Sequence, residues 1–408
     1  MKNKFYLLAL LAVMGLATTT VSCSSDDNIE NISTAPSKLT LNLSGENIAA
    51  IKSVTIDLKE TNTGETTTVV ATSANTEIEL KKGSYTITAN GTVELTTGEE
   101  IEAAGNAVLD LTQDNQNVNI SLGIKSFSED FIIEEVFFTG VQTFEGKNYN
   151  SGKYFKLTNN TNKTLNTGGL LIMKSAFNPA SNYDISPEIR STDFAVSAVM
   201  MIPTNLGKDV ASGDFVVIAD MAFNHNNANT PGYDLSNADY EYPNLDSPAL
   251  GQVDNPQVPD AVVIYSAANF NMFILHNRGF ESYAIARFPA SETVESWLTN
   301  YKYDYEYPNS AGNTTSKSVY KIPNAWILDG VNCAIEAVWE HNPLHSSIDS
   351  GWTACGTIDS DPSRYGKTVR RKIIGTMENG KNIYKDTNNS TEDFVKSSVS
   401  SFQNGIVH

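Results

Sequence analysis

The stretch KLTLNLS at residues 38–44 alternates apolar and polar residues. On a β-strand this spacing places Leu39, Leu41 and Leu43 on one face and their polar neighbours on the other. The same alternation returns in short runs up to residue 124, and turn sequences such as Asn90-Gly91 separate the runs. Six or seven short strands in about 85 residues predict a β-sandwich.

One of these runs also carries a resemblance. The segment LKKGSYTI at residues 80–87 resembles the hairpin of small prealbumin-like and carboxypeptidase-regulatory-like sandwiches, and many immunoglobulin-like domains contain something similar. We therefore predict an Ig-like or prealbumin-like β-sandwich over residues 38–124. The resemblance implies a spacer domain of the kind that is common in surface lipoproteins.

A second β-rich region is predicted at residues 127–408. Residues 153–160 and 163–170 look like the opening strands of a lamin-tail domain, and residues 369–372 and 386–394 resemble its closing segments. Much more chain lies between these halves than an ordinary lamin tail needs. We expect a mainly β fold in which a larger lamin-tail-like β-sandwich, with long insertions and a short helix, follows the first sandwich.

Two further segments point to a family. Residues 273–277 (FILHN) and 321–329 (KIPNAWILD) resemble those of an uncharacterised family of Bacteroidetes surface lipoproteins, over roughly residues 127–408. That family has no established activity to carry over, so the resemblance implies fold and location.

The insertions contain one predicted helix and one predicted loop. Ser291 can cap a helix in which Val294, Trp297 and Leu298 share one face. The Asn- and Pro-rich residues 224–259 are expected to form a long loop, and loops of that length are usually functional or mobile.

The N-terminus has the features of an exported lipoprotein. Lys2 and Lys4 precede an apolar run at residues 5–17, which suits the core of a signal peptide and is too short to span a bilayer. Residues 20–23 (TVSC) then resemble a lipobox, although Thr20 stands where that pattern favours Leu. We predict a signal peptide at residues 1–22 and lipidation of Cys23. The alternative is an ordinary secretory leader that contains a cysteine.

The predicted lipid anchor is followed by a polar tether at residues 23–37 with few residues able to build a core. Its start, Ser24-Ser25-Asp26-Asp27, looks like the export signal of Bacteroidetes surface lipoproteins. We therefore expect an outer-membrane protein that is held by lipid and displayed on the outer face.

The charge of the chain excludes some partners. A net charge of −19 argues against nucleic acid, because phosphate binding needs clustered Lys and Arg. It also argues against adsorption to an anionic membrane surface, so the lipid would provide the membrane contact.

Cys333 and Cys355 remain after Cys23 is assigned to the lipid. In an oxidising exported setting we predict that they form a disulfide, and two buried free thiols are the alternative. A catalytic role is less favoured, because neither cysteine lies in a motif that would activate its thiol.

Tyrosines are the candidate ligand-binding residues. A row that alternates with charged residues would line one face of a strand and could stack on a glycan or another flat ligand, or could pack in the core. A second group lies in the predicted long loop. The two groups are Tyr301, Tyr303, Tyr305 and Tyr307, and Tyr233, Tyr240 and Tyr242.

One segment is a candidate for Ca²⁺. Asp386, Asn388 and Ser390 place oxygen side chains at alternate positions, as the start of a calcium loop does. Thr391 stands where that loop needs Gly, and the alternative is a turn that Asn and Asp side chains stabilise through the backbone. No other cofactor is predicted.

The sequence has no nucleophile-elbow motif, phosphate loop or dinucleotide fingerprint. We expect a non-enzymatic binding or accessory module that captures a glycan or small-molecule nutrient, together with an outer-membrane transporter. An extracellular glycan or peptide hydrolase and a structural cell-surface protein are the alternatives.

Overall fold

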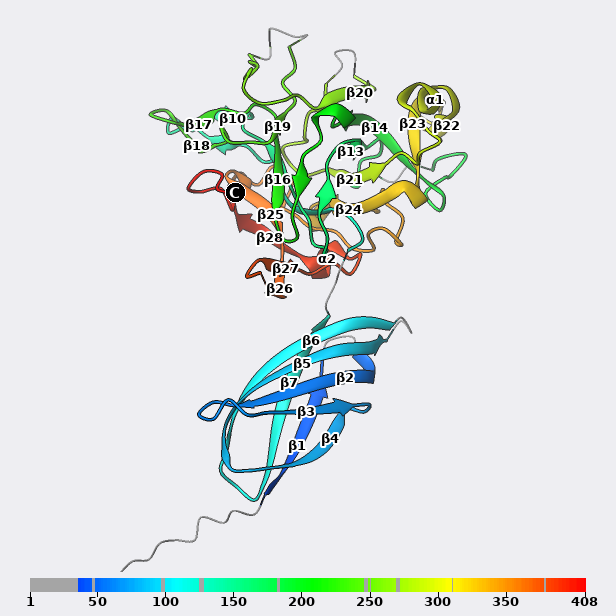
Figure 1. Cartoon of the computed structure of the whole chain (residues 1–408). Coiled ribbons are helices and arrows are strands. Elements are labelled where there is room, and N and C mark those ends of the chain that lie inside the picture. Colours follow the sequence, from blue (N-terminus) through cyan, green and yellow to red (C-terminus); the bar gives the residue numbers. More distant parts are fainter. Residues whose placement is uncertain are drawn as a thin grey trace, which may run out of the picture.

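Two β-rich lobes make up the described part of the chain (Figure 1). The computed structural model describes residues 36–408 apart from residues 46–47, 97–99, 125–127, 182–183, 246–248, 250, 269–271, 310 and 378. Cys23, the predicted leader and nearly all of the predicted tether lie outside the described residues. No helix in the described part is both long and apolar enough to cross a membrane.

The smaller lobe is a seven-stranded β-structure around one core. Its strands are hydrogen-bonded in the order β3-β2-β5-β6-β7-β1-β4, and β1 pairs in parallel with β7. Leu39, Leu41 and Leu43 are buried in the core, as their alternation predicts. The strands are β1 (Ser37–Ser44), β2 (Ile48–Glu60), β3 (Thr66–Ala71), β4 (Asn75–Leu80), β5 (Gly83–Leu95), β6 (Glu100–Leu111) and β7 (Asn115–Ile124).

The larger lobe begins with a six-stranded sheet in the order β19-β16-β11-β8-β25-β28. Segments that are far apart in sequence are neighbours in it, because β8 pairs with β11 on one side and with β25 on the other. The strands are β8 (Ile132–Phe137), β11 (Tyr154–Thr158), β16 (Phe215–Ala219), β19 (Tyr240–Glu241), β25 (Lys367–Arg371) and β28 (Phe394–Val399).

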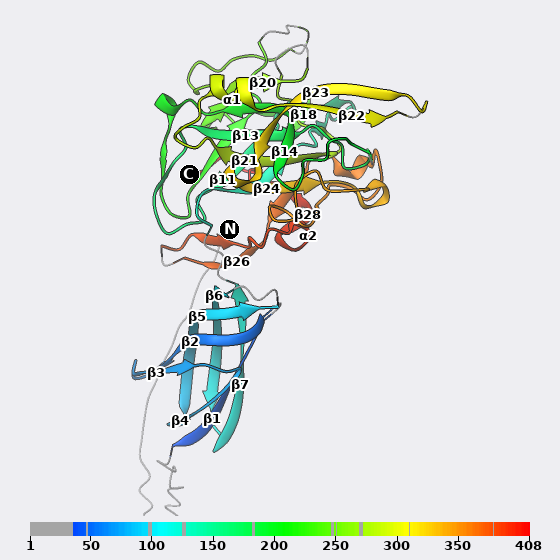
Figure 2. The ribbon, with the colours of Figure 1, turned by 90° about the vertical axis from the view of Figure 1, so that its right-hand side faces the viewer.

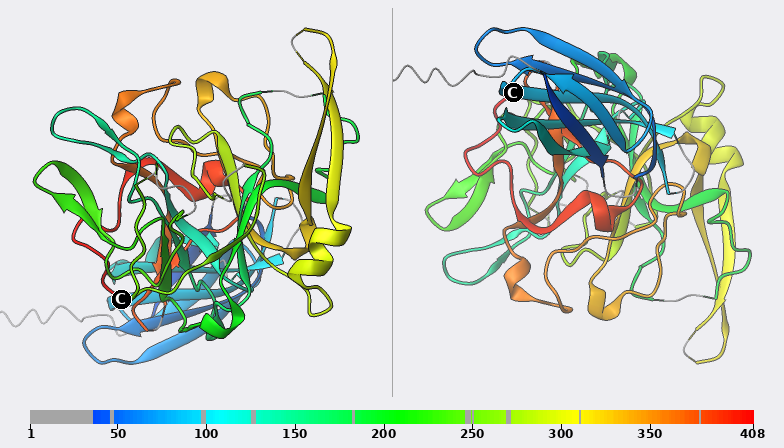
Figure 3. Two further views of the ribbon diagram at one scale, coloured as in Figure 1. Left: turned by 90° about the horizontal axis from the view of Figure 1, so that it is seen from above. Right: turned by 90° about the horizontal axis from the view of Figure 1, so that it is seen from below.

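A seven-stranded sheet forms the second layer of the larger lobe. Six of its strands follow the order β22-β23-β14-β13-β21-β24, and β20 pairs with β14 beside that path. The β22–β23 hairpin extends outward from the lobe (Figures 2 and 3). The strands are β13 (Leu170–Ser175), β14 (Asp193–Met201), β20 (Val262–Ser266), β21 (Glu281–Arg287), β22 (Lys302–Pro308), β23 (Thr314–Pro323) and β24 (Ile327–Cys333).

The main core of the larger lobe lies between these two sheets. Phe155 and Val369 of the six-stranded sheet belong to the same buried cluster as Ile172, Ile285 and Val331 of the seven-stranded sheet. Burial of this many apolar side chains is the main force that holds the two layers together. The mainly β sandwich class predicted from the sequence is confirmed.

Each sheet of this sandwich is also covered on its outer face. Trp297 of α1 packs with Leu171 and Ala284 on the seven-stranded sheet. Phe402 and Ile406, in the segment after β28, pack on the outer face of the six-stranded sheet. This segment covers only part of the outer face of the six-stranded sheet, and a pocket described below lies beside it.

Shorter elements lie between the strands of the two sheets along the chain. They are β9 (Val141–Gln142), β10 (Asn148–Tyr149), β12 (Leu165–Asn166), β15 (Asp209–Val210), β17 (Asn224–Asn227), β18 (Thr230–Asp234), β26 (Ile373–Thr376), β27 (Asn382–Tyr384), the helices α1 (Val294–Asn300) and α2 (Ser390–Asp393), and the 3₁₀ helices η1 (Thr204–Leu206), η3 (Asn324–Trp326), η4 (Glu336–Val338) and η5 (Pro362–Arg364).

Two local predictions need correction. The helix is capped by Thr293 rather than Ser291, because Thr293 and Ser296 exchange hydrogen bonds in a capping box. Residues 224–259 are not a single loop, since β17, β18 and β19 lie within them. β19 adds to the edge of the six-stranded sheet in parallel with β16, a pairing that local sequence does not reveal.

Candidate functional site

A pocket of about 410 Å³ lies on the outer face of the six-stranded sheet. Its lining comes from β11, β16 and β25, from the β26–β27 hairpin and from the segment after β28. The side chains that determine its chemistry are Lys156, Phe215, Arg370, Lys381, Ser401 and Phe402.

Strand alternation turns two cations toward this pocket. Phe155 and Leu157 on β11, and Val369 on β25, point into the core between the sheets. Their neighbours Lys156 and Arg370 therefore point to the opposite face. Because β8 lies between β11 and β25, the two cations stand on either side of it.

A buried glutamate on β8 pairs with the first cation. Lys156 Nζ donates to Glu134 Oε1 at 2.8 Å, and Thr158 Oγ1 donates to Glu134 Oε2 at 2.5 Å. Both charged side chains are almost completely buried, so breaking this pair would leave an uncompensated charge. Glu134 therefore accepts hydrogen bonds from Lys156 and Thr158 beneath the floor of the pocket and keeps Lys156 in place.

Glu135 is the second buried acid beside the pocket. Tyr154 donates its hydroxyl to Glu135 Oε1 at 2.5 Å, and the backbone N–H of Ser401 donates to both carboxylate oxygens. Burial raises the pKa of Glu135, and the nearby Glu134 adds to the effect. The Glu135 carboxylate thus fixes the backbone at Ser401, where the segment after β28 begins to line the pocket.

Arg370 differs from Lys156 because the N–H groups of its guanidinium are not engaged in hydrogen bonds with the described residues. Its Nε lies 3.8 Å from Glu134 Oε1 and from Glu135 Oε2, which is too long for a hydrogen bond. The guanidinium donates no side-chain hydrogen bond within the described residues, and 30% of the side chain is exposed. Ser401 Oγ is buried and likewise lacks a partner there.

Two phenyl rings border the cationic side of the pocket. The ammonium of Lys156 lies 4.1 Å from the ring centroid of Phe215 and 5.5 Å from that of Phe402. Cation–π contacts of this kind hold a lysine in place without using its remaining N–H donors. Phe215 also lines a smaller pocket of about 180 Å³, where His408 stacks on its ring.

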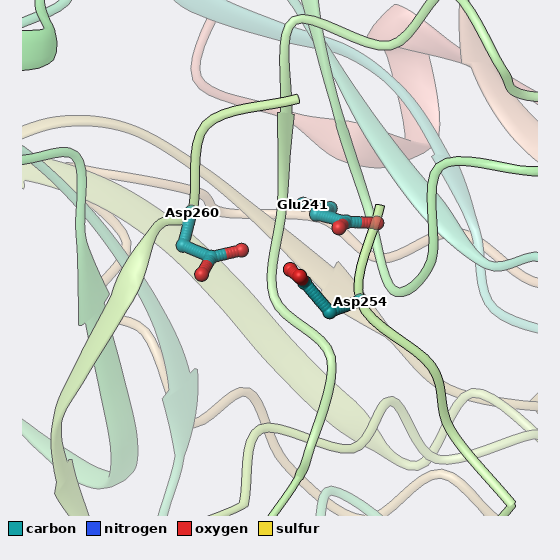
Figure 4. A group of neighbouring side chains, drawn as sticks. All are labelled: Glu241, Asp254 and Asp260. Carbon is teal, nitrogen blue, oxygen red and sulfur yellow. The ribbon is translucent and has the colours of Figure 1, made fainter. Parts of the chain in front are cut away.

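A separate group of carboxylates lies at the end of β19. Glu241, Asp254 and Asp260 bring one oxygen each within 4.8 Å of one another (Figure 4). Burial raises the pKa of Glu241, and its carboxylate neighbours add to the shift. Such oxygens can ligate Ca²⁺. However, the backbone N–H groups of Ala222 and Asn255 already donate to the two oxygens of Glu241, so the buried carboxylate is satisfied by the protein itself.

The tyrosines of the predicted loop belong to the core. Tyr240 and Tyr242 are buried between the sheets, and Tyr233 is half-buried with its hydroxyl donating to the carbonyl of Gly366 at 3.0 Å. The prediction that they are exposed binding aromatics is wrong. Tyr240 joins the six-stranded sheet on β19 and Tyr242 follows it into the core. Tyr233 lies on β18 and packs against Phe137.

The alternating tyrosine row does line one face, but that face is covered. Tyr303 and Tyr305 on β22 are buried with Phe177, and Tyr307 is partly buried beside them. Tyr301 precedes the strand, ends α1 and packs against Trp326. The core alternative therefore holds for this row, and its rings are not free to stack on a ligand.

The predicted calcium residues have separate partners. Asp386 accepts from Ser128 and Arg371, Asn388 donates to the carbonyl of Ser347, and Ser390 donates to Asp349. Because each side chain is engaged by a different part of the protein, the turn alternative is the better description of Asp386, Asn388 and Ser390. The turn is organised around Asp393, which accepts from the backbone of Thr387 and Asn389.

The two cysteines are buried free thiols, so the predicted disulfide between Cys333 and Cys355 is not formed in the structure. Both lie in the core between the sheets. Burial raises the pKa of each thiol, which keeps both protonated.

The sequence reasoning missed the residues of the pocket. Arg370 stands within the basic run at residues 369–372 that supported the lamin-tail resemblance, but nothing marked it as a site. Phe215 and Phe402 are about 190 positions apart, and their meeting follows from the order of strands in the sheet. The one local signal was the pair Arg370-Arg371 on a strand, where alternation must turn one arginine away from the core.

Residues 211–401 match the model of a family described as a protein of unknown function (DUF4876). This matched region includes β16, β25, β28 and the β26–β27 hairpin, which provide much of the pocket. No curated protein matches the chain significantly.

A solved structure resembles most of the chain. It is the crystal structure of a DUF4876 family protein from Bacteroides thetaiotaomicron, with a TM-score of 0.58 and 22% identity, covering 90% of this chain and 96% of that one. At this identity the likeness shows the fold alone.

Two other solved structures were found. A candidate adhesin from B. thetaiotaomicron has a TM-score of 0.19 and 10% identity, covering 30% of this chain and 65% of that one. One from Bacteroides ovatus has a TM-score of 0.21 and 7% identity, covering 76% and 89%. Both TM-scores are too low to indicate a shared fold.

Proposed function

We propose that this chain is an outer-membrane surface lipoprotein whose larger lobe is a non-enzymatic binding module. The observation that supports binding is the pocket on the six-stranded sheet, in which Arg370 and Ser401 keep hydrogen-bonding groups that no described residue uses. Its volume lies in the range of pockets that take small ligands. Capture of a nutrient for an outer-membrane transporter is the form of this function that we propose.

The proposed location rests on the sequence. Lipidated Cys23 and a polar tether would hold the protein at the membrane. In this proposal the smaller lobe is the prealbumin-like spacer and the larger lobe is the lamin-tail-like binding part. The spacer would keep the pocket away from the membrane surface.

A hydrolase is the weaker alternative. Hydrolysis of a glycosidic bond ordinarily needs two carboxyl groups that reach the substrate from either side. Among the described residues that line the pocket there is no carboxylate. Of the acids beside the pocket, Glu134 and Glu135 are fully buried and bound by Lys156, Thr158 and Tyr154. A third, Asp214, is paired with Lys381.

Filling the pocket tests the binding function. Asn404 is exposed and lines the pocket, whereas its exposed neighbour Gln403 does not. We expect the wild type and Gln403→Trp to retain at least one ligand on an array of immobilised glycans and peptides, and Asn404→Trp to lose it. Equal binding by both variants, or no binding by the wild type, would contradict the proposal.

Surface display needs a separate test on intact cells. Added proteinase should digest the wild-type protein, and Cys23→Ala should leave the membrane fraction. Protection from the proteinase would place the protein inside the outer membrane, and unchanged membrane association of the variant would rule out the lipid anchor. Affinity purification of the wild type from detergent extracts should recover a transporter, and its absence would remove the accessory role.

A further inference from the structure

The charged side chains that line the pocket are hydrogen-bond donors, and some of their donors have no partner among the described residues. Arg370 has five N–H donors, and none of them is used within the described residues. Ser401 adds a hydroxyl without a partner, and Lys381 adds an ammonium that is about half exposed. The charged side chains in the lining are all cations, although the chain as a whole carries a net charge of −19.

The buried carboxylates beside the pocket are already engaged. Glu134 accepts hydrogen bonds from Lys156 and Thr158, and Glu135 accepts them from Tyr154 and from the backbone of Ser401. These carboxylates keep the cations in place and do not face the pocket as free acceptors, since both are fully buried. The charged groups that a ligand meets in the lining are therefore all donors.

We infer that this pocket binds an organic oxyanion, a small ligand that carries a carboxylate or a sulfate group, and that Arg370 is the residue that recognises the anionic group. The inference rests on the proposed function and names its ligand class. Carboxylates and sulfates accept hydrogen bonds and donate none, so they match a donor-rich pocket. The planar fork of a guanidinium fits two oxygens of one such group at once.

Comparison with the other arginines supports this role. The chain has six arginines, and all of them lie in the described part. Five donate to a carboxylate or a carbonyl of the protein, and Arg370 alone does not. The five are Arg190, Arg278, Arg287, Arg364 and Arg371.

The neighbouring strands hold the backbone of Arg370 in position for ligand binding. Its backbone is paired with Glu135 of β8 on one side and with Val395 of β28 on the other, so the base of the side chain is fixed. Within the described residues, the ammonium of Lys381 is paired only with Asp214, and this pair is about half exposed. Exposed pairs of this kind contribute little to stability, so Lys381 can exchange its partner for the ligand at small cost.

Three sugars of similar size test the inference with the full-length protein. Glucuronate provides the carboxylate, glucose 6-sulfate provides the sulfate, and glucose is the neutral control. By titration calorimetry we expect one or both acids to bind and glucose not to bind. We expect Arg370→Gln to weaken binding of the acid about tenfold or more, Arg370→Lys to weaken it less, and added NaCl to weaken it in the wild type.

Arg278→Gln is the matched control, because Arg278 is similarly exposed and is bound to Asp359. It should bind as the wild type does. If Arg370→Gln does not fold, loss of acid binding by Asn404→Trp and its retention by Gln403→Trp keep the test valid. Binding of neither acid by the wild type, or equal binding of glucose, would overturn the oxyanion inference. If glucose binds and Asn404→Trp abolishes its binding, the binding module stands and only the ligand class is wrong.

Discussion

The guanidinium of Arg371 holds the carboxylate of Asp329 in the interior of the larger lobe, with Nη2 at 2.7 Å from both oxygens. Both side chains are almost fully buried. Arg371 also contacts Asp386 and Asp393, so it joins β24 and β25 to the turn that precedes β28. Its neighbour Arg370 faces the other way and opens to the pocket. Arg371 therefore stabilises the interior of the larger lobe, whereas the guanidinium of Arg370 can bind a ligand in the pocket.

Removal of one partner of this buried pair should be costly. We expect Asp329→Ala to lower the free energy of unfolding by about 3–5 kcal/mol, because Arg371 would keep a buried charge without its main partner. Urea unfolding measures the change. The exposed pair of Lys147 and Glu145 is the control, and Glu145→Ala should cost no more than about 1 kcal/mol. Equal effects at the two sites would show that Asp329 does not hold Arg371.

A buried lysine should make stability depend on pH. Lys153 is 4% exposed, and its ammonium donates to the carbonyl of Leu275 at 2.8 Å. Burial lowers its pKa from the ordinary 10.5 to about 8. Because the folded state loses this proton at lower pH than the unfolded state does, stability rises with pH between these two values.

The measurable difference is between the wild type and Lys153→Met. Raising the pH from about 7.5 to about 9.5 should stabilise the wild type by about 2 kcal/mol relative to that variant, as followed by urea unfolding. Lys147→Met, at an exposed position, should keep the pH dependence of the wild type. The same pH dependence in Lys153→Met would show that burial of Lys153 does not shift its proton affinity.

Period-two alternation was enough to predict the β class and many strands. Leu39, Leu41 and Leu43 lie on β1 and are buried as expected. Alternation states which side chains share a face, but it does not state whether a second layer covers that face. For this reason the burial of Tyr240 was not predicted, and alternation leaves the row at residues 301–307 open to a binding role or a core role. The residues that cover these rings, such as Phe177, come from distant parts of the chain.

The pocket was beyond prediction for a related reason. Lys156, Phe215, Arg370 and Phe402 meet because β16, β11, β8 and β25 are adjacent in the sheet and the segment after β28 folds over it. Such long-range pairing depends on the summed packing of both sheets, and no local spacing encodes it. The Cys333 and Cys355 pair shows the same limit, because sequence separation gives no information on how the thiols are oriented.

The state of the two thiols can be measured directly. In the full chain with Cys23→Ser, only Cys333 and Cys355 remain. Because both are buried with raised pKa values, a thiol reagent such as DTNB should react with neither in the native protein, even at about pH 9, and with both after unfolding in guanidinium. A denatured sample that reacts only after reduction would instead show that the disulfide forms.

The tyrosine row gives the sharpest contrast between a core role and a binding role. Tyr305 is 6% exposed, meets Phe177 edge to face at 5.1 Å between ring centroids and stacks on Tyr303 at 5.3 Å. Loss of a buried aromatic side chain leaves a cavity, so Tyr305→Ala should lower the free energy of unfolding by about 3 kcal/mol. Tyr307→Ala, at a partly buried position of the same row, should cost about 1 kcal/mol.

Ligand binding at the pocket should stay unchanged in both folded variants, because β22 does not contribute to its lining. A row that served as a binding platform would give the opposite pattern, with little loss of stability and a loss of ligand affinity.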